Sequence, residues 1–151
     1  MTTTDTGQSR RFQHLLVPTD FGEPAGRALT IAVDLATKWG SALTLLHTYE
    51  IPGYAYPGAM SVAVDLLTPV RDAAQARLDK ELAELRRRLP RADAVLCVGA
   101  PGHEIERVIR ETRVDLVVMG THGRHGLDRV LIGSVAEKVV RLSPVPVLTV
   151  H

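Results

Sequence analysis

Short apolar runs alternate along this chain with longer segments in which apolar residues recur at helical spacing. Runs that are apolar at successive positions suit strands buried on both faces, and the spaced segments suit helices that bury one side. The pattern predicts strands at residues 14–17, 42–47, 93–98, 114–119 and 145–150, with helices beginning at Glu23, at Thr68–Pro69, within 99–102 and at Ser134. Such strands, joined by helices, form a parallel sheet covered on both sides. We therefore expect an α/β fold: a three-layer, doubly wound, five-stranded parallel sheet.

Length and composition fit one domain with its own core. The chain has 151 residues, and we expect a flexible tail at residues 1–11 and the domain at residues 12–151. Only 4% of the residues are aromatic, so the core is aliphatic. The formal net charge of +1 creates no large field for a polyanion, and DNA or RNA is therefore not expected as a partner.

The chain carries one cysteine, Cys97, which fits a reducing compartment because it has no intrachain partner. It stands in an apolar run, where we expect a core residue. No apolar stretch approaches the roughly 18 residues of a membrane span. The polar N-terminus lacks the hydrophobic region of a secretory signal. We therefore expect a cytoplasmic location and no membrane partner.

Local signals mark the ends of the helices. Thr68 and Pro69 look like the cap and the first turn of the second helix, after the irregular segment 50–67. Ser134 and Glu137 have the spacing of a capping box. A cluster of arginines follows the second helix: Arg86, Arg87, Arg88 and Arg91. Nucleic-acid sites contain such clusters, but cations also complement the dipole at a helix C-terminus, and we favour this solvated surface.

Polar residues and glycines follow two of the predicted strands. The first strand runs into Pro-Thr-Asp at residues 18–20, and the fourth runs into the glycine-rich segment 120–126. In doubly wound sheets, ligands bind beyond the carboxyl ends of the strands, where the strand order reverses. Glycines let backbone N–H groups approach an anion, and the helix that begins after Gly133 adds unpaired donors. Together with the basic side chain of Arg124, these features predict a phosphate-binding site.

The glycine spacing differs from two common nucleotide motifs. From Gly120 the pattern is G-x2-G-x9-G-S, which ends at Ser134. A P-loop needs G-x4-G-K-[ST], and no lysine precedes Ser134. The dinucleotide fingerprint G-x-G-x-x-G would follow the first strand, where this chain has Pro-Thr-Asp instead.

The segment GTHGRHGLDRVLIGSVAEKVVR, residues 120–141, resembles the nucleotide-binding signature of ATP-binding universal stress proteins. The resemblance includes HLLVPTDF, LTLLHTYE, VGAPGHEI and SPVPVLTV, and thus almost the whole chain. It implies a Rossmann-like fold of the adenine nucleotide alpha hydrolase-like type. It also implies an ATP-binding module that acts as a nucleotide-dependent switch or adaptor in a stress response. Gly22 departs from the family, in which many members have a serine there, and this affects the cap of the first helix.

The resemblance implies a role for each site residue. Asp20 and the backbone of Thr48 would face the adenine, in a pocket lined by Pro18 and Thr19. The remaining residues would hold the ribose and the phosphates: Met119, Gly120, His122, Gly123, Arg124, Gly133, Ser134 and Val135. Met119 and Gly120 would border the ribose. The other residues would hold the phosphates, mainly through backbone N–H groups.

A transition-metal site and an enzyme active site are the two alternatives to a site that only binds a nucleotide. His122 and His125, with His47 and His103 near other strand ends, raise the possibility of a transition metal, but no Cys or carboxylate stands at ligand spacing. Mg²⁺ arriving with the nucleotide phosphates is favoured. For an enzyme, the sequence shows no nucleophile with an adjacent base. Asp20 is the best candidate for a general base, but its expected place is at the adenosine, far from the γ-phosphate. A slow ATPase or a nucleotide-transforming enzyme of the same fold is therefore kept as the alternative.

The last predicted strand is expected to join two copies of the chain. Beside the fourth strand, residues 145–150 would have one neighbour only and would lie at the edge of the sheet. They are apolar at nearly every position and carry no charge, and an exposed edge of this kind tends to pair. We therefore predict a homodimer through this strand, which the resemblance supports, and a protein partner that the sequence does not identify.

Overall fold

The computed structural model describes residues 11–50, 60–121 and 132–151, and of residues 60–67 only the backbone. The described elements, in chain order, are β1 (His14–Pro18), α1 (Glu23–Trp39), β2 (Ala42–Tyr49), α2 (Met60–Arg86), β3 (Asp93–Val98), α3 (Pro101–Glu111), β4 (Leu116–Gly120), α4 (Ser134–Leu142) and β5 (Val147–Val150). The predicted alternation of strands and helices is confirmed.

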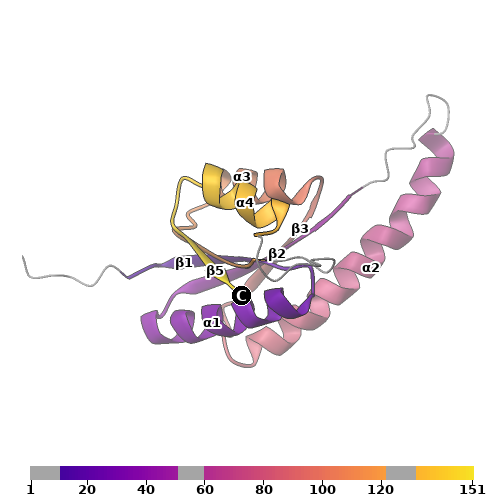
Figure 1. The fold of residues 1–151 in the computed structure, drawn as a ribbon. Coiled ribbons are helices and arrows are strands. Elements are labelled where there is room, and N and C mark those ends of the chain that lie inside the picture. Colours follow the sequence, from indigo (N-terminus) through magenta and orange to yellow (C-terminus); the bar gives the residue numbers. More distant parts are fainter. Residues whose placement is uncertain (1–10, 51–59, 122–131) are drawn as a thin grey trace, which may run out of the picture.

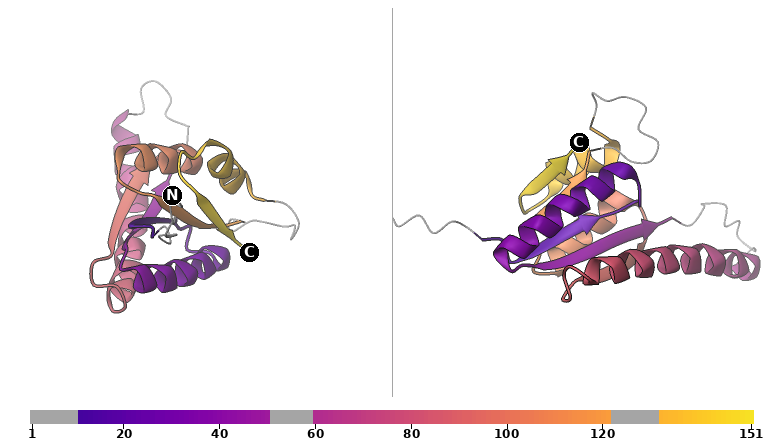
Figure 2. Two further views of the ribbon diagram at one scale, coloured as in Figure 1. Left: turned by 90° about the vertical axis from the view of Figure 1, so that its left-hand side faces the viewer. Right: turned by 90° about the horizontal axis from the view of Figure 1, so that it is seen from below.

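The strands form one parallel sheet in the order β3-β2-β1-β4-β5. Helices α1 and α2 cover one face, and α3 and α4 cover the other (Figures 1 and 2). The chain moves outward from β1 to β3, then crosses back to β4 and continues to β5. Because the strand order reverses between β1 and β4, the connections after these two strands diverge to opposite faces and leave room for a ligand. The predicted doubly wound, three-layer fold is confirmed.

Successive residues of β1 fill the two halves of the core. Leu15 and Val17 pack with α1 and α2, whereas Leu16 packs with α3 and α4, and all three are fully buried. Burial of each such side chain contributes about 1.5–3 kcal/mol. Cys97 lies in the half that contains α3 and α4, where burial raises the pKa of its thiol. The predicted core role of this cysteine is confirmed.

Helix α1 begins where the sequence indicates, and a glycine ends it. Pro24 stands in its first turn, and Gly40 caps its C-terminus with φ 71, a conformation that glycine adopts at little cost. Gly22 is the N-cap and supplies no side-chain hydrogen bond, which is the consequence expected of a glycine at this position.

The predicted start of the second helix is wrong. Helix α2 begins at Met60, and Pro69 lies inside it rather than in its first turn. Residues 60–68 contain no glycine or proline that would end a helix. A proline within a helix removes one backbone hydrogen bond and bends the axis, but the helix can continue through it. Pro69 therefore does not have to mark the start of α2. The N-terminal part of α2 extends beyond the sheet (Figure 1).

The capping box predicted at Ser134 is also wrong, although the helix does begin there. Gly133 is the N-cap of α4 and Ser134 is the first helical residue, without a side-chain cap hydrogen bond. The N–H of Glu137 donates to the carbonyl of Gly133 at 2.9 Å. Ser134 and Glu137 therefore occupy positions one residue further into the helix than a capping box requires.

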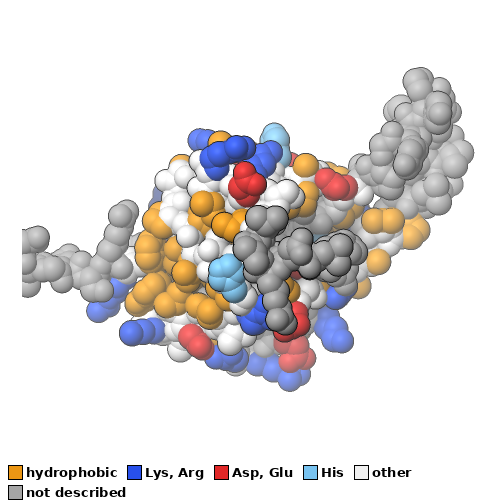
Figure 3. Space-filling view, viewed as in Figure 1, with side chains coloured by type: hydrophobic (Ala, Val, Ile, Leu, Met, Phe, Trp, Pro, Cys, Tyr) orange, Lys and Arg blue, Asp and Glu red, His pale blue; other side chains and the backbone are white. Residues whose placement is uncertain are grey.

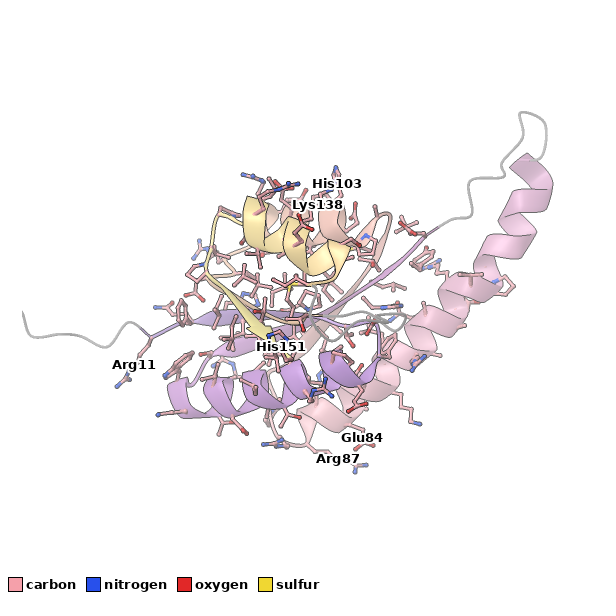
Figure 4. The ribbon with its side chains drawn as sticks, in the orientation of Figure 1. Arg11, Glu84, Arg87, His103, Lys138 and His151 are labelled. Carbon is pink, nitrogen blue, oxygen red and sulfur yellow. The ribbon has the colours of Figure 1, made fainter. Side chains whose placement is uncertain are left out.

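The arginines at the end of α2 lie on the surface. Arg88 pairs with Asp34 of α1 at 3.0 Å, and Arg87 pairs with Glu84 at 3.2 Å, close to the end of the helix (Figure 4). Exposed pairs of this kind contribute little to stability. Their arrangement agrees with the solvated surface that the sequence favours. Among the helices in the described part of the chain, none combines the length and apolar character needed to cross a membrane.

Candidate functional site

A cavity of about 680 Å³ opens at the carboxyl ends of β1, β2 and β4. It lies where the strand order reverses, and residues from the N-terminal ends of α3 and α4 form part of its wall. Every predicted site residue that the structure describes lines this cavity: Pro18, Thr19, Asp20, Thr48, Met119, Gly120, Gly133, Ser134 and Val135. The other three, His122, Gly123 and Arg124, lie outside the described residues.

The turn after β1 places two polar residues in the cavity wall. The N–H of Thr19 donates to the carbonyl of Leu46 in β2 at 2.8 Å, which holds the turn on the sheet. The Thr19 hydroxyl accepts from the N–H of Phe21 at 3.0 Å, and Oδ1 of Asp20 accepts from the N–H of Gly22 at 2.8 Å. Phe21 has φ 61, in the left-handed region that few residues other than glycine occupy. The turn is thus held in a strained conformation by its own side chains.

His47, at the end of β2, lines the same cavity and joins β2 to this turn. Its Nδ1 lies 2.8 Å from the carbonyl oxygen of Thr19. Because a carbonyl only accepts, Nδ1 carries the hydrogen. The imidazole also packs against the ring of Phe21, with the ring centroids 4.3 Å apart.

Backbone donors gather at the N-terminus of α4. The N–H groups of Ser134, Val135 and Ala136 belong to the first three residues of the helix and have no carbonyl partner within it. All three residues line the cavity, and the helix dipole places partial positive charge at this end. The N–H of Gly133 is already in use, because it donates to the carbonyl of Thr121 at 2.6 Å. This end of the cavity is therefore suited to an anion.

Gly120 is required by packing behind the cavity. A Cβ atom at this position would lie 2.8 Å from the carbonyl carbon of Pro24, so only glycine lets β4 end this close to the start of α1. The next residue, Thr121, is 1% exposed, and its hydroxyl lies 3.1 Å from Nδ1 of His151. Figure 4 shows His151 at the end of β5, where its carbonyl accepts from Nε of Arg27 in α1 at 2.8 Å. These contacts fix β4, β5 and α1 against one another.

The charged residues in the described part of the cavity wall are acidic: Asp20 and Glu50. Among the lining residues that the structure describes there is no lysine or arginine, so the N-terminus of α4 supplies the positive potential in that part. Within the same described ranges, no group of three or more His, Cys, Asp or Glu residues is arranged to hold a metal ion. His122 and His125 lie outside these ranges.

The lining residues that were not predicted are of two kinds. His47 lies near the end of β2, and Glu50 and Thr121 directly follow β2 and β4. The rule that ligands bind at the carboxyl ends of central strands, applied to each of these strands, would have found all three. The others are apolar, and their sequence positions indicate only a core: Ala25, Leu46, Pro101, Ile105 and Ala136.

Comparison with known proteins identifies the relatives of this chain. The universal stress protein family matches it over residues 11–151. The chain belongs to this family. Another universal stress protein, from the QAH/OAS sulfhydrylase 3′ region of Thermus aquaticus, is 31% identical over 145 residues, which cover 93% of this chain and 99% of that protein.

Solved structures of universal stress proteins share the fold. The structure of the universal stress protein UspA from Lactobacillus plantarum has a TM-score of 0.80 at 28% identity, over 94% of this chain and 99% of that one. A structure of a universal stress protein in complex with cAMP has a TM-score of 0.62 at 24% identity, over 94% of this chain and 98% of that one. The predicted family and fold are confirmed, and the more distant likeness shows the fold alone.

Proposed function

We propose that this universal stress protein binds ATP in the cavity at the carboxyl ends of β1, β2 and β4. The observation that carries the proposal is the set of N–H groups at Ser134, Val135 and Ala136, which lie at a helix N-terminus in the cavity wall. These donors suit phosphate oxygens and offer little to a nucleoside, so a triphosphate is expected to bind more tightly than a monophosphate. The cavity volume lies within the range of about 300–1,000 Å³ typical of small-molecule sites.

The proposed division of roles follows the two polar parts of the wall. Thr19, Asp20 and the backbone of Thr48 would receive the adenine, and Met119 and Gly120 would border the ribose. The phosphates would be held by residues after β4 and at the start of α4: His122, Gly123, Arg124, Ser134 and Val135. Gly133 would make room for them rather than donate a hydrogen bond, because its N–H is used by Thr121.

One comparison bears on the class of ligand. The distant relative solved with cAMP holds a molecule that also combines adenine, ribose and phosphate. That ligand belongs to the other protein, and here it supports only the proposed class. Mg²⁺, where present, would arrive on the phosphate oxygens, which are the hard ligands that this ion prefers.

The proposed role is that of a nucleotide-dependent switch or adaptor in a stress response, acting in the cytoplasm. Oδ1 of Asp20, the candidate base, accepts from Gly22 in the turn after β1, in the part of the wall assigned to the adenine. We therefore expect ATP turnover well below the typical enzyme value of about 10 s⁻¹. A phosphate-release assay with Mg²⁺ tests this. Rapid turnover that disappears in Asp20→Ala would favour the alternative, an ATPase.

We also propose a homodimer through residues 145–150. In the described sheet β5 pairs only with β4, so its other edge is open. Nearby apolar side chains are exposed: Val140 by 48%, Leu142 by 41% and Leu148 by 38%. Hydrophobic side chains gather on the face of the molecule that β5 crosses (Figure 3). A second copy would cover both the apolar side chains and the open edge.

One substitution tests ATP binding without unfolding the protein. Gly133 has φ −62 and ψ 153, which valine can adopt, and it lines the cavity, so that a branched side chain there should take up space needed by the phosphates. We expect Gly133→Val to lower ATP affinity by more than about tenfold, a loss of about 1.4 kcal/mol or more. Titration calorimetry measures the loss.

Ala100→Val is the matched control. Ala100 is the N-cap of α3, with φ −64 and ψ 124, but does not line the cavity. ATP affinity should stay within about twofold of wild type in this variant, since a change of that size is close to the scatter of surface substitutions. A folded Gly133→Val protein that binds ATP as tightly as wild type contradicts the proposed site.

A further inference from the structure

The strained turn after β1 is in contact with α2, none of whose described side chains lines the cavity. Phe21, at φ 61, stands between Asp20 and Gly22, and its neighbour Asp20 is in the cavity wall. A conformation of this kind persists only where the surroundings hold it. Contacts with neighbouring groups must therefore stabilise the backbone conformation of Phe21.

Phe21 packs against the core that contains α1 and α2, and two further side chains contact its ring. His47, itself in the cavity wall, lies with its ring centroid 4.3 Å from that of Phe21. Arg77 of α2 lies over the same ring, with Cζ 4.5 Å from the centroid. Its Nη2 also approaches the carbonyl oxygen of Phe21 at 3.4 Å. One guanidinium thus contacts both the ring and the backbone of the strained residue, a use that suits arginine better than lysine.

Glu81, one turn further along α2, offers a competing explanation for Arg77. Oε2 of Glu81 is buried without a hydrogen-bond partner among the described residues. Burial raises the pKa of this carboxyl group, and the nearby charge of Arg77 opposes that effect, while Asp20 adds to it. Arg77 therefore has two possible tasks: to offset the charge of Glu81, or to hold Phe21. Variants distinguish them.

We propose that Arg77 is a positioning residue for the end of the cavity that receives the adenine. It acts through Phe21, whose ring and carbonyl it holds, and thereby fixes Asp20 and the Thr19 carbonyl in the cavity wall. The inference rests on the proposed ATP site and adds an element to it, since no described side chain of α2 lines the cavity. Nucleotide affinity then depends on an exposed side chain that does not line the cavity.

The first test compares two arginines of α2. Arg77→Ala should weaken ATP binding about fivefold, the size expected when an exposed cation–π contact and a weak hydrogen bond are lost. Arg71→Ala removes the same charge from an exposed position of the same helix and should leave the affinity unchanged. Arg77→Lys, which keeps a cation near the ring, should recover part of the loss. Titration calorimetry gives the affinities, and circular dichroism checks that each variant is folded.

The second test asks whether Arg77 acts through Phe21. In a Phe21→Leu background, or Phe21→Met if the leucine variant does not fold, Arg77→Ala should change ATP affinity much less, because only the weak bond to the backbone carbonyl remains to be lost. Glu81→Gln keeps the shape of that side chain and removes its charge. In this background Arg77→Ala should still weaken ATP binding about fivefold, because the contacts with Phe21 are unchanged.

The possible outcomes separate the positioning role from the proposed function. Wild-type protein that does not bind ATP overturns the proposed function itself. Wild-type binding with equal affinities for Arg77→Ala and Arg71→Ala overturns the positioning role alone. The role is also overturned if Arg77→Ala weakens ATP binding equally with and without the Phe21 ring, or if Arg77→Ala has no effect on ATP binding in the Glu81→Gln background.

Discussion

Two glycines of the candidate site are required for different reasons, although they look alike in the sequence. Gly120 lies against the backbone of Pro24, so that any side chain there would collide with α1. Gly133 has an ordinary extended backbone, and its N–H is bonded to Thr121. Its lack of a side chain matters for the space in front of α4. The glycine spacing predicted that both residues belong to one candidate site, but the structure was needed to show that Gly120 is required by packing.

His14 gives the protein a dependence of stability on pH that is independent of the cavity. Its Nε2 lies 2.8 Å from the Thr44 hydroxyl, and burial lowers its pKa from the ordinary value of 6.5, against the opposing charges of Asp115 and Asp93. A lowered folded-state pKa means that the unfolded chain takes up the proton more readily. The stabilisation is therefore fully present above the unfolded-state pKa and is lost as pH falls through the folded-state pKa.

Comparison with His14→Gln isolates this effect. Glutamine keeps a hydrogen-bonding group near Thr44 but does not titrate. The free energy of unfolding of the wild type, relative to the variant, should fall as pH is lowered from about 8 to about 5. Urea denaturation at several pH values measures the difference. Parallel stability curves for the two proteins would show that His14 has no such role.

At the scale of the element, hydrophobic spacing predicted every helix and strand of the described chain, and the errors lie at element ends. The start of α2 was missed because Pro69 is read from sequence as a first-turn residue, whereas the helix continues through it. The cap of α4 was missed because Ser134 and Glu137 fit the capping spacing, although Gly133 has the cap conformation. Side-chain preferences reveal where a helix is favourable, but the first helical residue depends on tertiary contacts such as the bond between Gly133 and Thr121.

Strand β5 provides the prediction at this scale. Val150 is only 9% exposed and belongs to the core, so Leu148 is the residue to change. Leu148→Lys should place a charge on the exposed edge and give a folded monomer in light scattering. Val70→Lys, which changes an exposed apolar residue of α2, should leave the dimer intact. The dimer prediction fails if the wild-type protein is already monomeric at high micromolar concentration.

At the scale of the whole molecule, the topology creates the site. The reversal of strand order between β1 and β4 sends α1 to one face and α4 to the other, and the cavity opens at the carboxyl ends of these strands. The turn with Asp20 and the N-terminus of α4 are thus far apart in the sequence and share one cavity. Their strand-end positions were readable from sequence, because a parallel sheet aligns its carboxyl ends. The apolar residues Ala25 and Ile105 were not, because a cavity wall and a core have the same composition.

The most direct measurement of ATP binding is an NMR titration of ¹⁵N-labelled protein with ATP. The amide signals of Ser134, Val135 and Ala136 should shift progressively and reach a plateau, because their N–H groups would donate to the phosphates. Signals of Ala100 and Gly102, at the start of α3, serve as the comparison and should move less. If the amide signals of these three α4 residues do not shift at ATP concentrations up to the millimolar range, the assignment of this cavity to ATP is contradicted.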